Sequence, residues 1–130
     1  MNYKYFLDTY AWADLFDGTE KGKRVKELVE QGNVATSMIA LAELSDKCAR
    51  ENRELEPFVS FIEAKSPILP LAKDIATHSG KLKKALRAAS GNVSLADAIH
   101  FQTAKAFGAT FVTGDPDFKE VKLRGLLFLE

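Results

Sequence analysis

Asp8 and Asp115 each come just after a short run of residues of the kind that forms a buried strand. The runs are residues 3–7, rich in aromatic side chains, and residues 110–113. If the two strands are neighbours in a parallel sheet, both carboxylates lie at its carboxyl edge, where open α/β sheets bind their ligands. Carboxylate oxygens are ligands that Mg²⁺ and Mn²⁺ prefer. Both residues are therefore predicted to belong to a divalent-metal site.

Two further acids are candidates for the same site. Glu43 lies in the strongly apolar segment 39–44, where burial of an unpaired carboxylate would be costly. The alternative is a surface ion pair with Lys47, four residues later. Asp97 follows Ser94 at the spacing of a helix capping box, so it also has a purely structural interpretation. Converging carboxylates would hold one or two ions, and two ions about 4 Å apart can activate water and stabilise the leaving oxygen in phosphodiester cleavage.

The other acids and a nearby histidine have structural alternatives too. Asp8 can cap the helix that follows it, and Asp115 and Asp117 flank a proline in a segment typical of a turn. His100 is three residues after Asp97 and can share its helix face. A zinc site is not predicted, because no second histidine is near. We interpret His100 as a packing residue or as a partner of a metal ligand.

The elements that must position these residues alternate between strands and helices. The expected strands are residues 3–7, 34–36, 68–69, 110–113 and 126–129. The expected helices are residues 10–16, 20–30, 38–50, 55–64, 74–89 and 94–107. Strands separated by helices indicate a parallel sheet covered on both faces. The length of 130 residues suits one α/β domain over residues 1–130, because a chain of this size can build its own core.

Several large or apolar side chains are expected in that core. They are the aromatic residues Trp12, Phe16, Phe101 and Phe107 and, on the helix at 38–50, a stripe of Met38, Leu41, Ala42, Cys48 and Ala49.

The charged residues balance, because Lys plus Arg and Asp plus Glu both total 18. This zero net charge argues against a protein that holds DNA by bulk charge alone, although local patches can still attract nucleic acid. The candidates for such substrate contacts are Lys47, Lys81, Lys84 and Arg87. The alternative for the run on residues 81–87 is a solvated helix face.

The compartment is predicted from cysteine content and hydropathy. Cys48 is the single cysteine, which excludes an internal disulfide and fits a reducing compartment. The N-terminal apolar run is too short for a signal peptide. No stretch approaches the roughly 18 apolar residues of a membrane span. We expect a soluble cytoplasmic protein without membrane contact.

Four motifs, in this order along the chain, resemble the PIN domain, and most of all the VapC-type toxins of toxin–antitoxin pairs. They are FLDT at residues 6–9, LAEL at 41–44, SLADAIH at 94–100 and VTGDPDF at 112–118. Each motif is weak alone, but the four together, with similar spacing, cover essentially the whole chain.

The resemblance implies a three-layer α/β/α fold whose central, mostly parallel sheet has the order 3-2-1-4-5 between helices. The implied activity is endonucleolytic cleavage of RNA with one or two Mg²⁺ or Mn²⁺ ions. By motif match, the catalytic and metal-binding acids would be Asp8, Glu43, Asp97 and Asp115. The supporting residues would be Asp117 as a further acid, Thr113 as a hydroxyl that orients water or a carboxylate, and Thr9 beside Asp8.

The resemblance also implies protein partners. Members of the family commonly form homodimers, and toxins of this type are held inactive by a small antitoxin whose segment enters the acidic groove. Other chains with this domain process RNA without an antitoxin, so the resemblance also allows a nuclease of that kind.

Two other classes of function compete with a nuclease. A catalytically silent protein of the same fold would use its acidic groove to dock a basic partner segment. A phosphatase or phosphoacceptor domain would use Asp8 as nucleophile. The haloacid-dehalogenase type of phosphatase needs a second aspartate two residues later, where this chain has Tyr10.

Overall fold

A computed structural model describes residues 3–89 and 91–130. Within these residues five parallel strands form one sheet in the order β3-β2-β1-β4-β5, as predicted. The strands are β1 Tyr5–Leu7, β2 Val34–Ser37, β3 Ile68–Leu69, β4 Thr110–Thr113 and β5 Leu126–Phe128. The central pair is β1 and β4, which are registered with Leu7 beside Val112.

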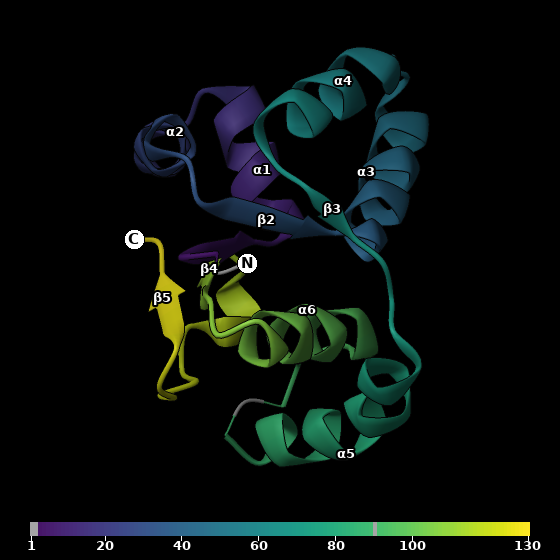
Figure 1. Cartoon of the computed structure of the whole chain (residues 1–130), viewed down its shortest axis with the longest axis vertical. Helices are drawn as coiled ribbons and strands as arrows, with labels where there is room; N and C mark the ends of the chain where they lie inside the picture. Colours follow the sequence, from purple (N-terminus) through teal and green to yellow (C-terminus); the bar gives the residue numbers. More distant parts are fainter. Residues whose placement is uncertain (1–2, 90) are drawn as a thin grey trace.

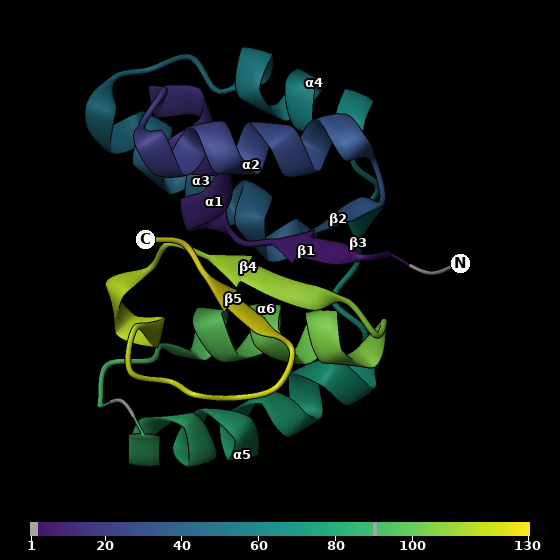
Figure 2. The ribbon, with the colours of Figure 1, turned by 90° about the vertical axis from the view of Figure 1, so that its left-hand side faces the viewer.

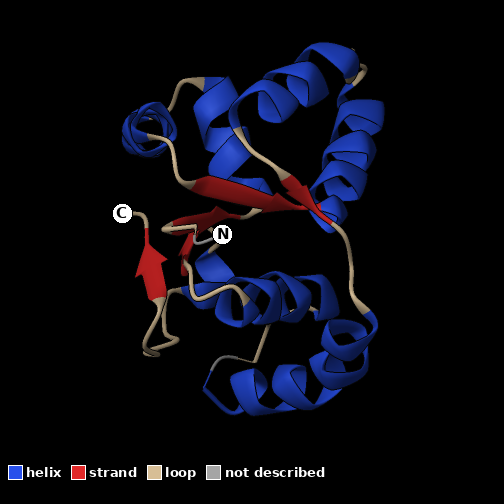
Figure 3. Ribbon diagram, in the orientation of Figure 1, coloured by secondary structure: helices blue, strands red, loops and turns tan. Residues whose placement is uncertain are grey.

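Helices cover both faces of the sheet (Figures 1 and 3). One face carries α1 Thr9–Asp17, α2 Glu20–Gln31, α3 Met38–Glu51 and α4 Glu56–Lys65. The other carries α5 Lys73–Ala89 and α6 Leu95–Ala106. Figure 2 shows α6 directly against the sheet, whereas α5 lies outside it. A short 3-10 helix, η1 Pro116–Phe118, follows β4. In the described part of the chain, no helix is long and apolar enough to cross a membrane.

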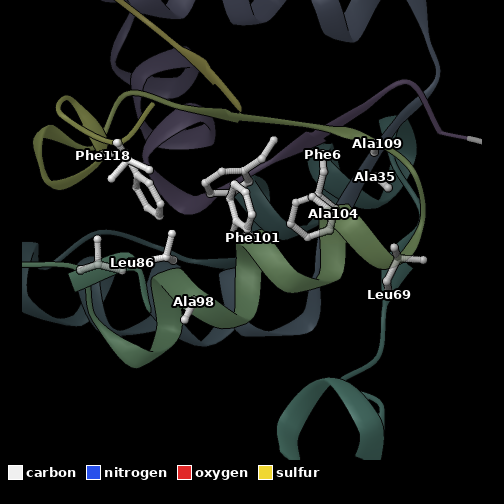
Figure 4. Packing of buried hydrophobic residues seen from close by; sticks show 12 residues of the cluster. Phe6, Ala35, Leu69, Leu86, Ala98, Phe101, Ala104, Ala109 and Phe118 are labelled. Atoms are coloured by element: carbon white, nitrogen blue, oxygen red, sulfur yellow. The ribbon is translucent and has the colours of Figure 1, made fainter. Parts of the chain in front are cut away.

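Successive strand side chains point to opposite faces of the sheet, so the strands contribute to an apolar core on each side of it. Phe6 and Phe111 belong to the core beneath α6, and Figure 4 shows Phe6, Phe101 and Phe118 in it. The Phe111 ring packs against Phe101 of α6 and Phe118 of η1, with centroids 5.7 and 5.2 Å away. The alternate residues of the same strands, among them Leu7 and Val112, face the core under α1 to α4. Two apolar cores of this kind fix the register of β1 and β4, and therefore the level at which each strand ends.

Trp12 fills the second core and is fully buried, as predicted. Its indole Nε1 donates a hydrogen bond to the Thr36 hydroxyl at 3.0 Å, so this buried N–H is paired. Phe101 and Cys48 are also buried, and Phe16 is half-buried.

Two core predictions are wrong. Phe107 caps the C-terminus of α6 and is 38% exposed. On α3 the buried row is Ala40, Leu44 and Cys48, whereas Met38 is 47% exposed and Ala42 and Ala49 are exposed. The first turns of α3 are apolar on every side, so their composition does not indicate which face packs. The row spaced four residues apart faces the core.

Candidate active site

The candidate site lies at the carboxyl edge of the sheet, between the ends of β1 and β4. Asp8 follows β1, Asp115 follows β4 after one glycine, and Asp97 lies in the first turn of α6. All three side chains are buried, with exposed fractions of 1%, 3% and 7%. The predicted convergence of Asp8 and Asp115 therefore follows from the neighbouring positions of their strands.

Asp8 is held through both of its carboxylate oxygens. Oδ1 accepts a hydrogen bond from the backbone N–H of Ala11 at 2.8 Å, which caps α1. Oδ2 accepts one from the Thr113 hydroxyl at 2.5 Å. The Thr113 oxygen itself accepts from the backbone N–H of Asp115 at 3.0 Å. A single hydroxyl thus joins the residues that follow two neighbouring strands.

Asp97 and Asp115 also cap helices. Asp97 completes the predicted capping box, accepting from the Ser94 backbone N–H at 3.0 Å while the Ser94 hydroxyl accepts from the Asp97 N–H at 3.1 Å. Asp115 Oδ1 accepts from the Asp117 N–H at 2.9 Å at the start of η1. These caps fix the position of each carboxylate relative to its helix.

The cluster could hold a metal ion. Asp97, Asp115 and Asp117 each offer a carboxylate oxygen, and these oxygens lie within 4.8 Å of one another. Asp8 is outside this group but close to it. The charge of Asp97 raises the pKa of Asp8, and the charge of Asp8 raises the pKa of Asp115. Oxygen ligands at this separation suit Mg²⁺ or Mn²⁺.

Burial and mutual repulsion raise the pKa values of two acids in the cluster. Burial raises the pKa of Asp8 to about 7, although Thr113, His100 and the Ala11 N–H favour its ionised form. Burial also raises the pKa of Asp115 to about 7, with further increases from the charges of Asp97, Asp117 and Asp8. Bringing several carboxylates together in a buried site disfavours full ionisation unless a cation neutralises them.

Glu43 stands apart from this cluster and is bound to two other residues. Its Oε1 accepts a hydrogen bond from the Thr9 hydroxyl at 2.5 Å and lies 2.6 Å from Nε2 of His100. Burial alone would raise the pKa of Glu43, but His100 and Thr9 outweigh burial and hold that pKa below its ordinary value.

The alternative of a surface ion pair between Glu43 and Lys47 is wrong. Lys47 pairs instead with Glu51, one turn further along α3, at 2.7 Å. His100 was interpreted either as a packing residue or as a partner of a metal ligand. It contacts Glu43, one of the predicted site acids. No local sequence pattern indicated that these two residues meet, because they are 57 positions apart.

A groove of about 560 Å³ opens beside Glu43, between α1 and α3. Its lining residues are Thr9, Tyr10, Ala13, Ala42, Glu43, Asp46, Lys47 and Arg50. Tyr10, which was not predicted as a site residue, is 48% exposed. Partial burial and then the charges of the four nearby aspartates, Asp115 foremost, raise the pKa of its phenol. Tyr10 therefore links the groove to the acid cluster.

The predicted basic residues divide into two groups. Lys47 lines the groove beside Glu43. Lys81, Lys84 and Arg87 are exposed on α5, and none of them lines the groove among the described residues. Arg87 also has a structural role, because its Nε donates to the Val93 carbonyl at 2.8 Å in the segment before α6.

Solved structures of other proteins share this fold over nearly the whole chain. A toxin–antitoxin complex from Klebsiella pneumoniae matches with a TM-score of 0.74 at 22% identity, covering 98% of each chain. VapC20 of Mycobacterium tuberculosis, described as a toxin that cleaves the sarcin–ricin loop, matches with a TM-score of 0.71 at 21% identity, covering 93% of this chain and 99% of that one. VapBC-1 from nontypeable Haemophilus influenzae matches with a TM-score of 0.68 at 24% identity, covering 96% and 97%. At these identities the likeness shows a shared fold.

Sequence comparison identifies the family. No curated protein matches the chain. The PIN domain signature, however, matches residues 5–123, which include β1, α6, β4 and the acids at their ends. Together with the sheet order and the position of the acid cluster, this match shows that the chain belongs to the PIN domain family.

Proposed function

We propose that this chain is a metal-dependent endoribonuclease that acts as the toxin of a toxin–antitoxin pair. The observation that carries the proposal is the convergence of Asp8, Asp97, Asp115 and Asp117 at the carboxyl edge of a PIN domain sheet. Structural neighbours that are toxin–antitoxin complexes, and one described as an RNA-loop-cleaving toxin, support the same activity.

The donor set fits Mg²⁺ or Mn²⁺. All the converging donors are carboxylate oxygens, and the pKa values of Asp8 and Asp115 are raised mainly by burial, which disfavours the ionised carboxylates. Asp8, Asp97 and Asp115 would hold one or two ions, with Asp117 and Glu43 completing the site directly or through water. A divalent cation bound there supplies Lewis acidity and positive charge for phosphodiester hydrolysis.

The residues of the chain supply position and charge. Thr113 holds Asp8 and Asp115 in a fixed relation, so the acids need not reorganise when a phosphodiester arrives. Glu43 is kept ionised by His100 and Thr9 and borders the groove. Lys47 offers a cation on the same groove wall for a phosphate of the RNA backbone.

The partners belong to the proposal as well. We expect the residues 1–130 to act as one nuclease domain, with RNA following the groove and the α5 residues Lys81, Lys84 and Arg87 giving more distant backbone contacts. A small antitoxin would occupy the acidic groove and block it. A homodimer is expected, and the exposed Met38 and Phe61 are apolar side chains available for such a contact.

The test is cleavage of a panel of structured and single-stranded RNAs by the purified protein. Reactions contain Mg²⁺, Mn²⁺ or EDTA, and wild type is compared with the double variant Asp8→Asn, Asp97→Asn. We expect cleavage that requires metal and falls at least about 100-fold in the double variant. The matched control is Glu20→Gln, Glu30→Gln on α2, which makes the same change in net charge at exposed positions.

The competing function is a silent domain that binds a basic segment in the acidic groove. If wild type and the double variant are equally inactive with every metal, the nuclease proposal is overturned in favour of that alternative. Metal-dependent cleavage that the double variant retains would place the active site elsewhere.

A further inference from the structure

Glu43 is held by two side chains that come from the elements carrying the other acids. Thr9 follows Asp8 at the start of α1, and His100 lies one turn after Asp97 on α6. We propose that His100, with Thr9, is a positioning residue that fixes the Glu43 carboxylate for metal binding; this inference rests on the proposed function.

Both partners bind the same oxygen of Glu43. Oε1 receives the Thr9 hydroxyl at 2.5 Å and faces His100 Nε2 at 2.6 Å, whereas no hydrogen bond to Oε2 is found among the described residues. The side chain is 36% exposed and borders the groove. One oxygen is thus used for anchoring, and the second stays available to a ligand in the groove.

The burial of His100 supports a role beyond packing. The ring is 1% exposed and lies 6.3 Å from the Phe6 ring, in surroundings where a polar side chain is costly unless it is paired. Within the described residues, Nδ1 has no hydrogen-bond partner. Nε2 is therefore the paired nitrogen of the ring, and a hydrogen on it is directed at Glu43.

This arrangement coordinates three elements. Glu43 comes from α3, and a free glutamate there would sample several rotamers at the edge of the groove. Because its anchors sit beside Asp8 and Asp97, its position is set relative to both acids. Partners that orient metal ligands in this way typically change metal affinity or activity 10- to 100-fold when they are removed.

The test is a double-mutant cycle on Mn²⁺ affinity, measured by calorimetry on the metal-stripped full chain. We expect His100→Leu to weaken Mn²⁺ binding about tenfold and His100→Gln, which keeps an N–H donor, to recover most of that loss. In a Glu43→Ala background, His100→Leu should add less than about a twofold change. The control is Thr103→Val, a buried position on the same helix whose hydroxyl donates to the Ile99 carbonyl within α6.

The outcomes separate this inference from the function on which it rests. Wild type that binds no Mn²⁺ would overturn the proposed metal site and this inference with it. The inference alone would be overturned if wild type binds Mn²⁺ but His100→Leu does not change the affinity. The same holds if His100→Leu changes the affinity equally in the wild-type and Glu43→Ala backgrounds. If His100→Leu does not fold, Thr9→Val takes its place in the cycle, because Thr9 donates to the same oxygen, and the same two results decide.

Discussion

The carboxylates of the acid cluster combine a structural role at helix ends with the metal-binding role proposed for them. Asp8, Asp97 and Asp115 each cap a helix, and the three also converge at one edge of the sheet. The sequence presented capping and metal binding as alternatives, but the two are compatible because the two oxygens of a carboxylate have about four lone-pair sites. A cap removes rotamer freedom from the side chain, and a rigid ligand loses less entropy when an ion binds.

For these single residues we predict that they make the metal-free protein less stable as the pH rises. Burial raises the pKa of Asp8 and Asp115 to about 7. From about pH 4 to pH 7 the folded state therefore holds protons that the unfolded chain has lost. The stabilisation is fully present below about pH 4 and is lost as the pH rises through 7. Asp8→Asn keeps a capping oxygen but does not titrate.

Urea unfolding in EDTA at about pH 5 and about pH 8 checks this prediction. We expect the free energy of unfolding to fall between these two pH values in wild type. In Asp8→Asn the fall should be smaller by about 2 kcal/mol. Glu30→Gln, at an exposed position, should behave as wild type. Equal losses in Asp8→Asn and wild type would show that the pKa of Asp8 is not raised.

At the scale of elements, α1 and α2 pack closely against each other in the second half of α1. Gly22 on α2 lies so close to α1 that a Cβ atom there would be 2.0 Å from the Asp14 carbonyl oxygen. A backbone atom cannot move aside as a flexible side chain can, so any side chain at this position must separate the two helices.

We predict that Gly22→Ala lowers the free energy of unfolding by about 2 kcal/mol or more. The matched control is Gly80→Ala on α5, where a Cβ would meet no atom within 4 Å. There alanine should stabilise by up to about 1 kcal/mol, because it has the higher helix propensity. Chemical denaturation of both variants measures the difference. A Gly22→Ala variant as stable as Gly80→Ala would contradict this account of the helix contact.

At the scale of the whole molecule, the zero net charge conceals a concentration of acids at one edge of the sheet. This concentration disfavours the folded state when the acids ionise, and any cation that binds the folded state alone will offset it. The stability of the molecule should therefore depend on divalent metal.

We predict that saturating Mn²⁺ or Mg²⁺ raises the melting temperature by roughly 5–10 °C at neutral pH. The double variant Asp8→Asn, Asp97→Asn should show little rise, because it lacks two of the proposed ligands. Differential scanning calorimetry of both proteins, with and without EDTA, measures the effect. An unchanged melting temperature in wild type would argue against the acid cluster as a metal site.

The sequence by itself determined the elements and their order. Strands, helices and caps depend on residues within a few positions of one another, so Asp8, Ser94 and Gly18 indicate helix ends without knowledge of the fold. The convergence of Asp8 and Asp115 also followed from the sequence, because parallel strands place their carboxyl ends at one edge.

Only the tertiary structure decided which face of α3 packs, that Phe107 is exposed, and what Glu43 binds. Local spacing favoured Lys47 as the partner of Glu43, but Lys47 has a second acid, Glu51, one turn further along the same helix. The actual partner, His100, is 57 positions away. The physical reason is that such a contact depends on how α3 and α6 are placed around the end of β1, and no local pattern encodes that placement.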